Sequence, residues 1–278
     1  MAALRIFSYL PNPRIWKATI TARLCGVEIE VRGASPRELS QWLWDFDARP
    51  IAQVPRETLA GAERTGRIGF ADQKLYKTDA FLKAHPFGTV PAAFSPDGCT
   101  GIFESNSIMR AVARLGAGCF PVYGRDAYES SRIDAFLDAG LVFARDSQIY
   151  LLALSNGAVS GELYGRMKGS LSAYLSGIER ALSSKRAFLV GDNVTLADIC
   201  FVAELCLFHN EKARNSVLEA AGLSPLLGAE FTKSFRRSTT HFRRLLAHPA
   251  FVPDVGGYLD KIERSGGHIK NVSSTRDT

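Results

Sequence analysis

The residues best suited to chemistry lie in one short segment, from position 87 to position 109. Val90-Pro91 begins a predicted strand, where the missing donor of proline is tolerated, and Asp97-Gly98 predicts a tight hairpin turn after it. Glu104 and Ser105 open a predicted helix; Ser105 is a good N-cap, and the unpaired N–H groups behind it attract an anion. A carboxylate beside such a helix start suits a ligand that carries both an ammonium and a carboxylate, as the free end of an amino acid does.

The run Phe103-Glu104-Ser105-Asn106, with Val90-Pro91 before it, resembles the glutathione-binding half of the glutathione transferase superfamily. In that family a thioredoxin-like domain carries a cis-proline after Val or Ile, then two antiparallel strands, then a Glu-Ser pair. The sequence also resembles the transferase-like region of the gamma subunit of eukaryotic elongation factor 1, over residues 4–34 and 75–255. This resemblance implies an α/β thioredoxin-like N-terminal domain followed by an all-α helical C-terminal domain.

The elements that must position these residues begin as a thioredoxin-like domain does. Leu4 to Leu10 alternate as a strand, and Arg14 to Leu24 form a helix that Gly26 ends. Val27 to Val31 alternate strictly and predict a second strand. With a last helix over residues 105–115, we expect this domain to span residues 1–115.

A long insertion, at about residues 35–74, interrupts this pattern. Pro36 to Asp45 predicts a short aromatic helix, and Pro50 to Gln73, rich in Gly, Arg and Ala, predicts a connection without regular structure. Gln53-Val54-Pro55 imitates the cis-proline site, but no hairpin with a Glu-Ser pair follows it, so we reject it. The sequence leaves open whether the insertion is a lid, a dimer element or a mobile loop.

The second half of the chain predicts helices. Thr195 and Asp198 form a capping box, which nucleates a core helix rather than doing chemistry. We expect a linker over residues 116–123, an all-α domain over residues 125–260 and a mobile tail over residues 265–278. The other long helices are expected at Ala127 to Leu154, Gly161 to Ser183 and Phe231 to Ala247.

Composition argues against several classes of protein. No run of about 18 apolar residues exists, and no basic segment followed by an apolar one opens the chain, so we expect neither a membrane span nor secretion. The five cysteines lack framework spacing, and neither they nor the five histidines show metal-ligand spacing. We therefore expect reduced thiols in the cytoplasm and no metal. The net charge of +6 favours anionic ligands, and the arginines at 236, 237, 243 and 244 are expected to form a solvated helix face, not a nucleic-acid site.

The resemblance implies that the group stabilising a glutathione thiolate lies between the first strand and the first helix. Tyr9-Leu10-Pro11 resembles the Tyr-x-Pro of tyrosine-dependent classes, Asn12 has an amide N–H to donate, and Arg14 adds positive charge. The serine or cysteine that other classes place just before this helix is absent. Alternative interpretations remain open, namely a core phenol for Tyr9, a turn residue for Asn12 and a surface charge for Arg14.

The same resemblance assigns glutathione, as co-substrate, to Val90, Pro91, Glu104, Ser105 and Asn106. The backbone of Val90 would pair with the cysteinyl unit like an added strand, beside a cis Pro91. Ser105 would hold the γ-glutamyl carboxylate and Glu104 its ammonium, while Asn106 occupies a position that varies in the family.

The predicted function is that of a glutathione S-transferase, which conjugates glutathione to small hydrophobic electrophiles, as in detoxification. The resemblance also implies a homodimer. The alternative is a non-catalytic glutathione-binding or protein-interaction module, which the missing serine or cysteine and the aromatic insertion favour. Glutathione-dependent ether or halide cleavage is not distinguished from conjugation. Phe143, Arg145 and Tyr150 are expected either to contact the electrophile or to pack in the helical core.

Overall fold

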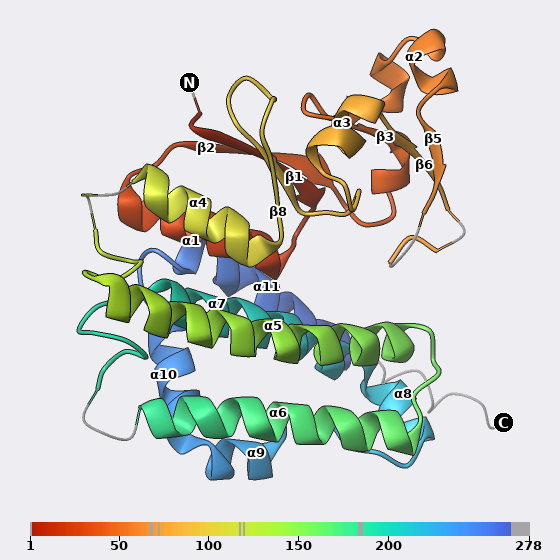
Figure 1. The fold of residues 1–278 in the computed structure, drawn as a ribbon. Coiled ribbons are helices and arrows are strands. Elements are labelled where there is room, and N and C mark those ends of the chain that lie inside the picture. The colour runs from red at the N-terminus through yellow and green to blue at the C-terminus, as the bar shows by residue number, and fades with distance from the viewer. Residues whose placement is uncertain are drawn as a thin grey trace, which may run out of the picture. The chain divides into compact units, whose positions relative to one another are not determined.

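The computed structural model describes residues 2–66, 69–71, 73–116, 118, 120–182 and 186–267. The chain divides into two compact units, residues 1–120 and residues 121–278, and each is described by itself. Figure 1 shows a sheet with helices in the first unit and helices in the second. No helix in the described ranges is both long and apolar enough to cross a lipid bilayer.

The first unit is built on a four-stranded sheet with the order β2-β1-β7-β8. The strands are β1 (Leu4–Tyr9), β2 (Ile29–Ala34), β7 (Ala92–Phe94) and β8 (Gly101–Phe103). The first two strands are parallel and are joined by helix α1 (Pro13–Cys25), whereas β7 runs antiparallel to both β1 and β8. The predicted β-α-β opening and thioredoxin-like fold class are therefore confirmed.

Alternating side chains of β1 and β7 enter two different cores, as the two-residue period of a strand requires. Leu4, Ile6 and Ala93 pack against α1 and α4 (Ser105–Leu115), which lie side by side. Phe7 and Phe94 point to the opposite face and join an aromatic core. The sheet is thus covered on both faces, by two helices on one and by the insertion on the other.

The insertion has regular structure, so the prediction of an aromatic helix followed by an unstructured connection is wrong. Residues 39–77 form a second sheet, of order β4-β3-β6-β5, which appears in orange at the upper right of Figure 1. Its elements are the 3-10 turn Leu39–Gln41, β3 (Trp42–Trp44), β4 (Arg49–Pro50), the 3-10 turn Ile51–Gln53, α2 (Arg56–Ala60), β5 (Glu63–Thr65) and β6 (Lys74–Lys77).

Long-range pairing explains why the local pattern misled. β3 pairs in parallel with β6 across some thirty residues, and the helix signal of residues 36–45 gives way to this strand. Trp44 is buried among Phe7, Phe70 and Phe81, and its indole N–H donates to the carbonyl of Leu39 at 3.0 Å. The rejected Val54-Pro55 lies in the insertion, where Val54 packs in a small core of its own.

An ion-pair cluster links the insertion to the first sheet. Arg5 of β1 contacts Glu30 of β2 at 2.8 Å, and Arg49 contacts Asp47 at 2.9 Å. Arg32 bridges the two carboxylates, because it pairs with both Glu30 and Asp47. The hydrogen bond from Arg32, together with the charge of Arg5, lowers the pKa of Glu30, even though burial opposes that shift.

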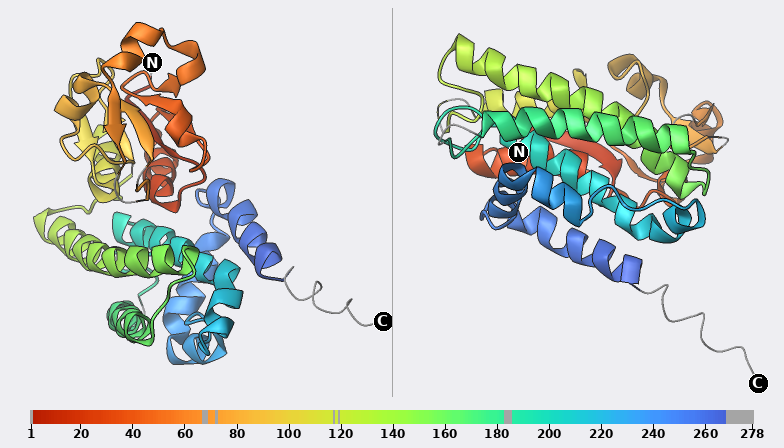
Figure 2. Two further views of the ribbon diagram at one scale, coloured as in Figure 1. Left: turned by 90° about the vertical axis from the view of Figure 1, so that its right-hand side faces the viewer. Right: turned by 90° about the horizontal axis from the view of Figure 1, so that it is seen from below.

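The second unit consists of helices only in its described residues. α5 (Ala127–Ser155) packs against both α6 (Gly161–Ala181) and α7 (Leu196–Phe208), and Figure 2 shows these long helices running alongside one another. The remaining elements are the 3-10 segment His209–Arg214, α8 (Asn215–Ala220), α9 (Ala229–Ser234), α10 (Arg236–Leu246) and α11 (Val252–Gly267). The predicted all-α class is confirmed.

Two helix predictions in this unit need correction. Residues 231–247 are not one helix, because Phe235 has φ −120° and ψ 56° and separates α9 from α10. Residues 265–267 of the predicted tail belong to α11, and the rest of that tail lies outside the described residues.

The predicted capping box at the start of α7 is confirmed. Thr195 donates its backbone N–H and its hydroxyl to the buried Asp198 carboxylate, both at 2.9 Å. The other oxygen of Asp198 accepts from the backbone of Leu189 at 3.0 Å and contacts His241 of α10 at 2.8 Å. One carboxylate therefore fixes the helix start, the loop before it and a third helix.

Candidate functional site

The β7–β8 hairpin brings the two halves of the predicted motif together. In the register of the pair, Ala92 lies opposite Phe103. Val90-Pro91 directly precedes Ala92, and Glu104 directly follows Phe103, so all four site residues gather at the same end of the hairpin. The Val90–Pro91 peptide bond is cis, as the resemblance implied, and so is Leu10–Pro11; Val54–Pro55 is not among the cis bonds of the described residues.

Glu104 has an unusual backbone. It is the one non-glycine residue in the described ranges with positive φ, at φ 65° and ψ 121°. Its side chain is exposed, and its carbonyl accepts the first helical hydrogen bond, from Ile108 at 3.0 Å. Strain of this kind persists where the surroundings enforce it, often at ligand sites. The N-cap of α4 is therefore Glu104, and the prediction that Ser105 fills that position is wrong by one residue.

Ser105 is the first residue of α4 and is 8% exposed. It therefore lies among the first N–H groups of the helix, which in any α-helix lack carbonyl partners within the helix. Its hydroxyl oxygen does not cap the helix, because it accepts a hydrogen bond from Lys17 of α1 at 3.2 Å. Asn106 accepts from the same ammonium at 2.7 Å and is likewise buried.

Lys17 is the residue that sequence reasoning missed. It is 1% exposed, and it stands between Trp16 and Ala18 in the middle of a helix whose other buried residues are mostly apolar. A lysine in that setting is seldom fully buried unless it is paired. A lysine at a buried position of a mostly apolar helix face was the signal in the sequence that a polar contact exists there. The sequence did not show which residues make that contact, because Ser105 and Asn106 lie far from Lys17 in the chain.

The three predicted catalytic residues lie around the turn between β1 and α1: Tyr9 ends the strand, Asn12 caps the helix and Arg14 is in its first turn. Tyr9 is half-buried and packs at the edge of the same aromatic core as Val90. Asn12 is 1% exposed; its carbonyl oxygen caps α1 by accepting from the N–H of Arg14 at 3.0 Å, and its amide donates to Ser8 at 3.1 Å. Arg14 is half-buried. The hairpin site and Tyr9 thus border one core, whereas the side chain of Asn12 is occupied by the turn itself.

Two buried polar residues fix the loop that leads into Val90. Lys77 donates to the carbonyl of Gly88 at 2.7 Å, and its ammonium lies 4.6 Å from the ring centroid of Trp44. His85 accepts from the N–H of Gly88 at 3.2 Å, and burial lowers the pKa of His85, which favours the neutral acceptor. The insertion therefore supports the candidate site through Trp44 and Lys77.

Of the three residues in the second unit expected either to contact the electrophile or to pack in the core, two are buried and one is exposed. Phe143 is buried and stacks on Tyr174 with ring centroids 4.7 Å apart. Tyr150 is buried and donates to Glu211 at 2.7 Å; burial raises the pKa of both groups. Arg145 is exposed. Phe143 and Tyr150 are therefore core residues.

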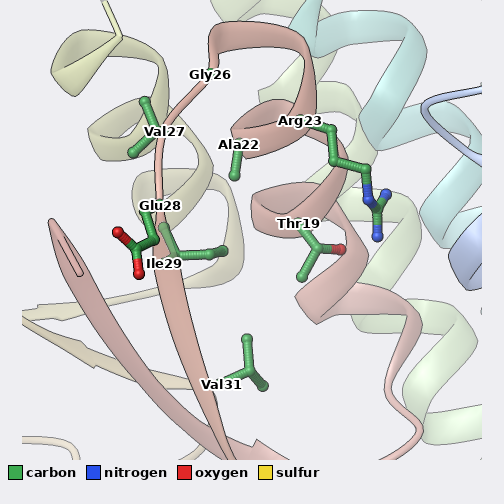
Figure 3. Close-up of a pocket in the computed structure, with 8 residues that line it drawn as sticks. All are labelled: Thr19, Ala22, Arg23, Gly26, Val27, Glu28, Ile29 and Val31. Atoms are coloured by element: carbon green, nitrogen blue, oxygen red, sulfur yellow. The ribbon is translucent and has the colours of Figure 1, made fainter. Parts of the chain in front are cut away.

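A surface hollow of about 570 Å³ lies between α1 and β2, away from the hairpin site. Figure 3 shows its lining, which includes none of the predicted site residues. Within the described ranges, no group of three or more His, Cys, Asp or Glu side chains is placed to hold a metal ion.

Comparison with known proteins agrees with this geometry. The family described as the C-terminal domain of glutathione S-transferase matches residues 134–223. Glutathione S-transferase III, solved in apo form, superposes with a TM-score of 0.61 at 17% identity, covering 92% of this chain and 97% of that one. The chain has the glutathione transferase fold. A transferase from Phanerochaete chrysosporium, solved with oxidized glutathione, gives a TM-score of 0.63 at 16% identity, with coverage of 95% and 98%.

Curated relatives point to one branch of this fold and confirm the second part of the resemblance. Probable elongation factor 1-gamma 1 of Arabidopsis thaliana is 30% identical over 189 residues, which is 65% of this chain and 40% of the relative. Elongation factor 1-gamma of Homo sapiens is 26% identical over 227 residues, 79% of this chain and 42% of the relative. The chain thus spans about two fifths of the length of these relatives.

Proposed function

We propose that the first unit binds glutathione at the end of the β7–β8 hairpin. The observation that carries this proposal is the meeting of Val90-Pro91 with the strained Glu104 and the start of α4. Val90 lies two residues before β7, where its backbone groups can pair with an extended peptide. Solved proteins of the same fold contain glutathione or oxidized glutathione, which supports this choice of ligand.

The two ends of the γ-glutamyl group find opposite charges at this site. Glu104 is exposed and presents a carboxylate to the ligand ammonium. Ser105 and the N–H groups of the first turn of α4 face the ligand carboxylate, which the positive end of the helix attracts. A zwitterionic amino-acid end fits this pairing better than a simple anion does, because a simple anion would be repelled by Glu104.

The reaction we propose is conjugation of glutathione to a small hydrophobic electrophile. The thiol proton leaves to solvent, and the thiolate sulfur forms a bond to an electrophilic carbon. That carbon either loses its leaving group with the bonding electron pair or, when it belongs to an activated double bond, passes the π electron pair to the neighbouring atom, which is then protonated from solvent. Tyr9 is the proposed donor to the thiolate, since it borders the same core as Val90, where the cysteinyl unit would lie. Arg14 is proposed to add positive charge, and Asn12 to act by holding the turn that joins the strand of Tyr9 to the helix of Arg14.

A non-catalytic glutathione-binding or interaction module is the second candidate. The observation in its favour is that the Asn12 side chain is buried and engaged on both its atoms, which leaves Tyr9 as the main candidate for thiolate stabilisation. The similarity to elongation factor 1-gamma proteins supports the same candidate.

Calorimetry with glutathione and a generic thiol-conjugation assay separate the two candidates. Binding with turnover supports the transferase, and Tyr9→Phe should then lower kcat roughly a hundredfold, because a smaller fraction of the bound thiol is ionised once its hydrogen-bond donor is lost. Tyr128→Phe is the control, since Tyr128 is 88% exposed. Binding without turnover selects the module, and no heat with millimolar glutathione refutes the site.

Three further features belong to this proposal. We propose that the domains span residues 1–115 and 125–260, that the protein is a homodimer, and that it acts in the cytoplasm. The free thiols of the four described cysteines suit a reducing compartment. Light scattering coupled to gel filtration tests the dimer, and a monomeric mass at micromolar concentration would contradict it.

A further inference from the structure

The Lys17 ammonium determines which atom of Ser105 accepts a hydrogen bond. A lysine ammonium has three N–H donors and no acceptor, whereas a serine hydroxyl has one donor and two acceptor lone pairs. In the 3.2 Å contact between Lys17 Nζ and Ser105 Oγ, the lysine therefore donates and the serine accepts. The hydroxyl hydrogen of Ser105 must then point away from Lys17.

That hydroxyl hydrogen has no protein acceptor among the described residues, although Ser105 is only 8% exposed. A buried donor without an acceptor costs free energy, so a ligand that accepts a hydrogen bond from this hydroxyl would remove that cost. The backbone N–H groups at the start of α4 are donors as well. The hydroxyl hydrogen of Ser105 and the leading N–H groups of α4 thus both offer hydrogen-bond donors to a ligand.

We propose that Lys17 is a positioning residue that makes this end of the site specific for a carboxylate. Held at 2.7 Å by Asn106, its ammonium occupies a lone pair of Ser105 and polarises the hydroxyl, which then donates to the ligand. Lys17 does not touch the ligand, since it is 1% exposed. This inference rests on the proposed glutathione function, in which Ser105 holds the α-carboxylate of the γ-glutamyl group, and it adds the role of Lys17.

The test compares two ligands on the full-length protein. One is glutathione, and the other is the peptide in which 4-aminobutyrate replaces the γ-glutamyl unit, so that the ammonium and thiol remain and the α-carboxylate is gone. Calorimetry should show that the wild type prefers glutathione by about a hundredfold, from two charge-assisted hydrogen bonds. In Lys17→Met this preference should fall about tenfold, with less than a twofold change in the affinity for the carboxylate-free peptide.

A control and a double-mutant cycle isolate the pathway through Ser105. Lys83→Met removes an exposed lysine of the same unit and should change neither affinity. Ser105→Ala should lower the preference at least as much as Lys17→Met, and adding Lys17→Met to Ser105→Ala should cause no further loss. Circular dichroism establishes that each variant is folded.

The outcomes are distinguishable. Equal losses for both ligands in a folded Lys17→Met variant, or an unchanged preference, overturn the role of Lys17 while the glutathione site stands. If the lysine variant does not fold, the wild type and Ser105→Ala decide: a wild-type preference below threefold overturns the inference. Absence of glutathione binding to the wild type overturns the proposed function and this inference together.

Discussion

Replacing Glu104 by glycine should stabilise the first unit while weakening ligand binding. Glu104 adopts φ 65° and ψ 121°, a conformation that costs an L-residue about 1–3 kcal/mol. Glycine adopts it freely but loses about 0.5–1 kcal/mol more chain entropy on folding. The balance is a gain of about 1 kcal/mol in the free energy of unfolding. The ligand ammonium loses its carboxylate partner, so the Kd for glutathione should rise about tenfold.

Glu104→Ala is the matched control, because it removes the carboxylate but keeps the Cβ atom that makes the backbone conformation costly. Its affinity for glutathione should fall as much as that of Glu104→Gly. Its stability should stay within about 0.5 kcal/mol of the wild type, as expected for an exposed position. The difference between the two variants therefore measures the backbone strain less the extra chain entropy that glycine loses on folding.

Tryptophan fluorescence during urea unfolding reports on the first unit selectively. The chain has three tryptophans, Trp16, Trp42 and Trp44, and all of them belong to residues 1–120. Equal midpoints for Glu104→Gly and Glu104→Ala would show that the backbone strain does not exceed the entropy cost of glycine and would refute the predicted gain in stability. Unchanged glutathione affinity in both variants would show that Glu104 does not receive the ligand ammonium.

Three further predictions concern stability. Asp198→Ala should lower the free energy of unfolding by about 3–5 kcal/mol, because it leaves buried donors without the carboxylate that accepts from them. Urea unfolding followed by far-ultraviolet circular dichroism measures this loss, and a loss below about 1 kcal/mol would contradict the prediction. Burial lowers the pKa of His209 to about 4, so the unfolded chain binds its proton first as the pH falls below about 6.5, and stability should drop by up to about 3 kcal/mol towards pH 4. His209→Gln should remove that part of the pH dependence, and an unchanged slope would refute the assignment. Gly101→Ala should cost more than about 3 kcal/mol in fluorescence-monitored unfolding, since the new Cβ would lie 2.1 Å from the carbonyl oxygen of Ala84; a variant as stable as the wild type would show that α3 (Asp79–Ala84) shifts freely.

Local signals in the sequence were enough for the elements that carry them. The sequence predicts that Gly26 ends the first helix, and the structure places the C-cap of α1 at Gly26, although the helix begins at Pro13, one residue before the predicted start. Asp97-Gly98 turns the hairpin, with φ 74° at Gly98. These signals work because each depends on a few neighbouring residues and on the hydrogen bonds they make with one another.

The insertion shows where local reasoning fails. Its strands are short, and each is stabilised by a partner distant in the chain, as β3 is by β6. The aromatic residues of 42–46 have no helical or strand period long enough to read, and only the core around Trp44 decides that they form a strand. A pairing between distant segments leaves no periodic trace in either segment alone.

By itself the sequence determined the hairpin and the capping box of α7, because each depends on a few neighbouring residues. The resemblance of its motifs to a known family implied the two fold classes and the grouping of Val90, Pro91, Glu104 and Ser105. Only the tertiary structure decided that the insertion forms a sheet and that Lys17 lies beneath Ser105. Both depend on contacts between segments far apart in the chain, and the free energy of such contacts comes from burial, which no single segment encodes.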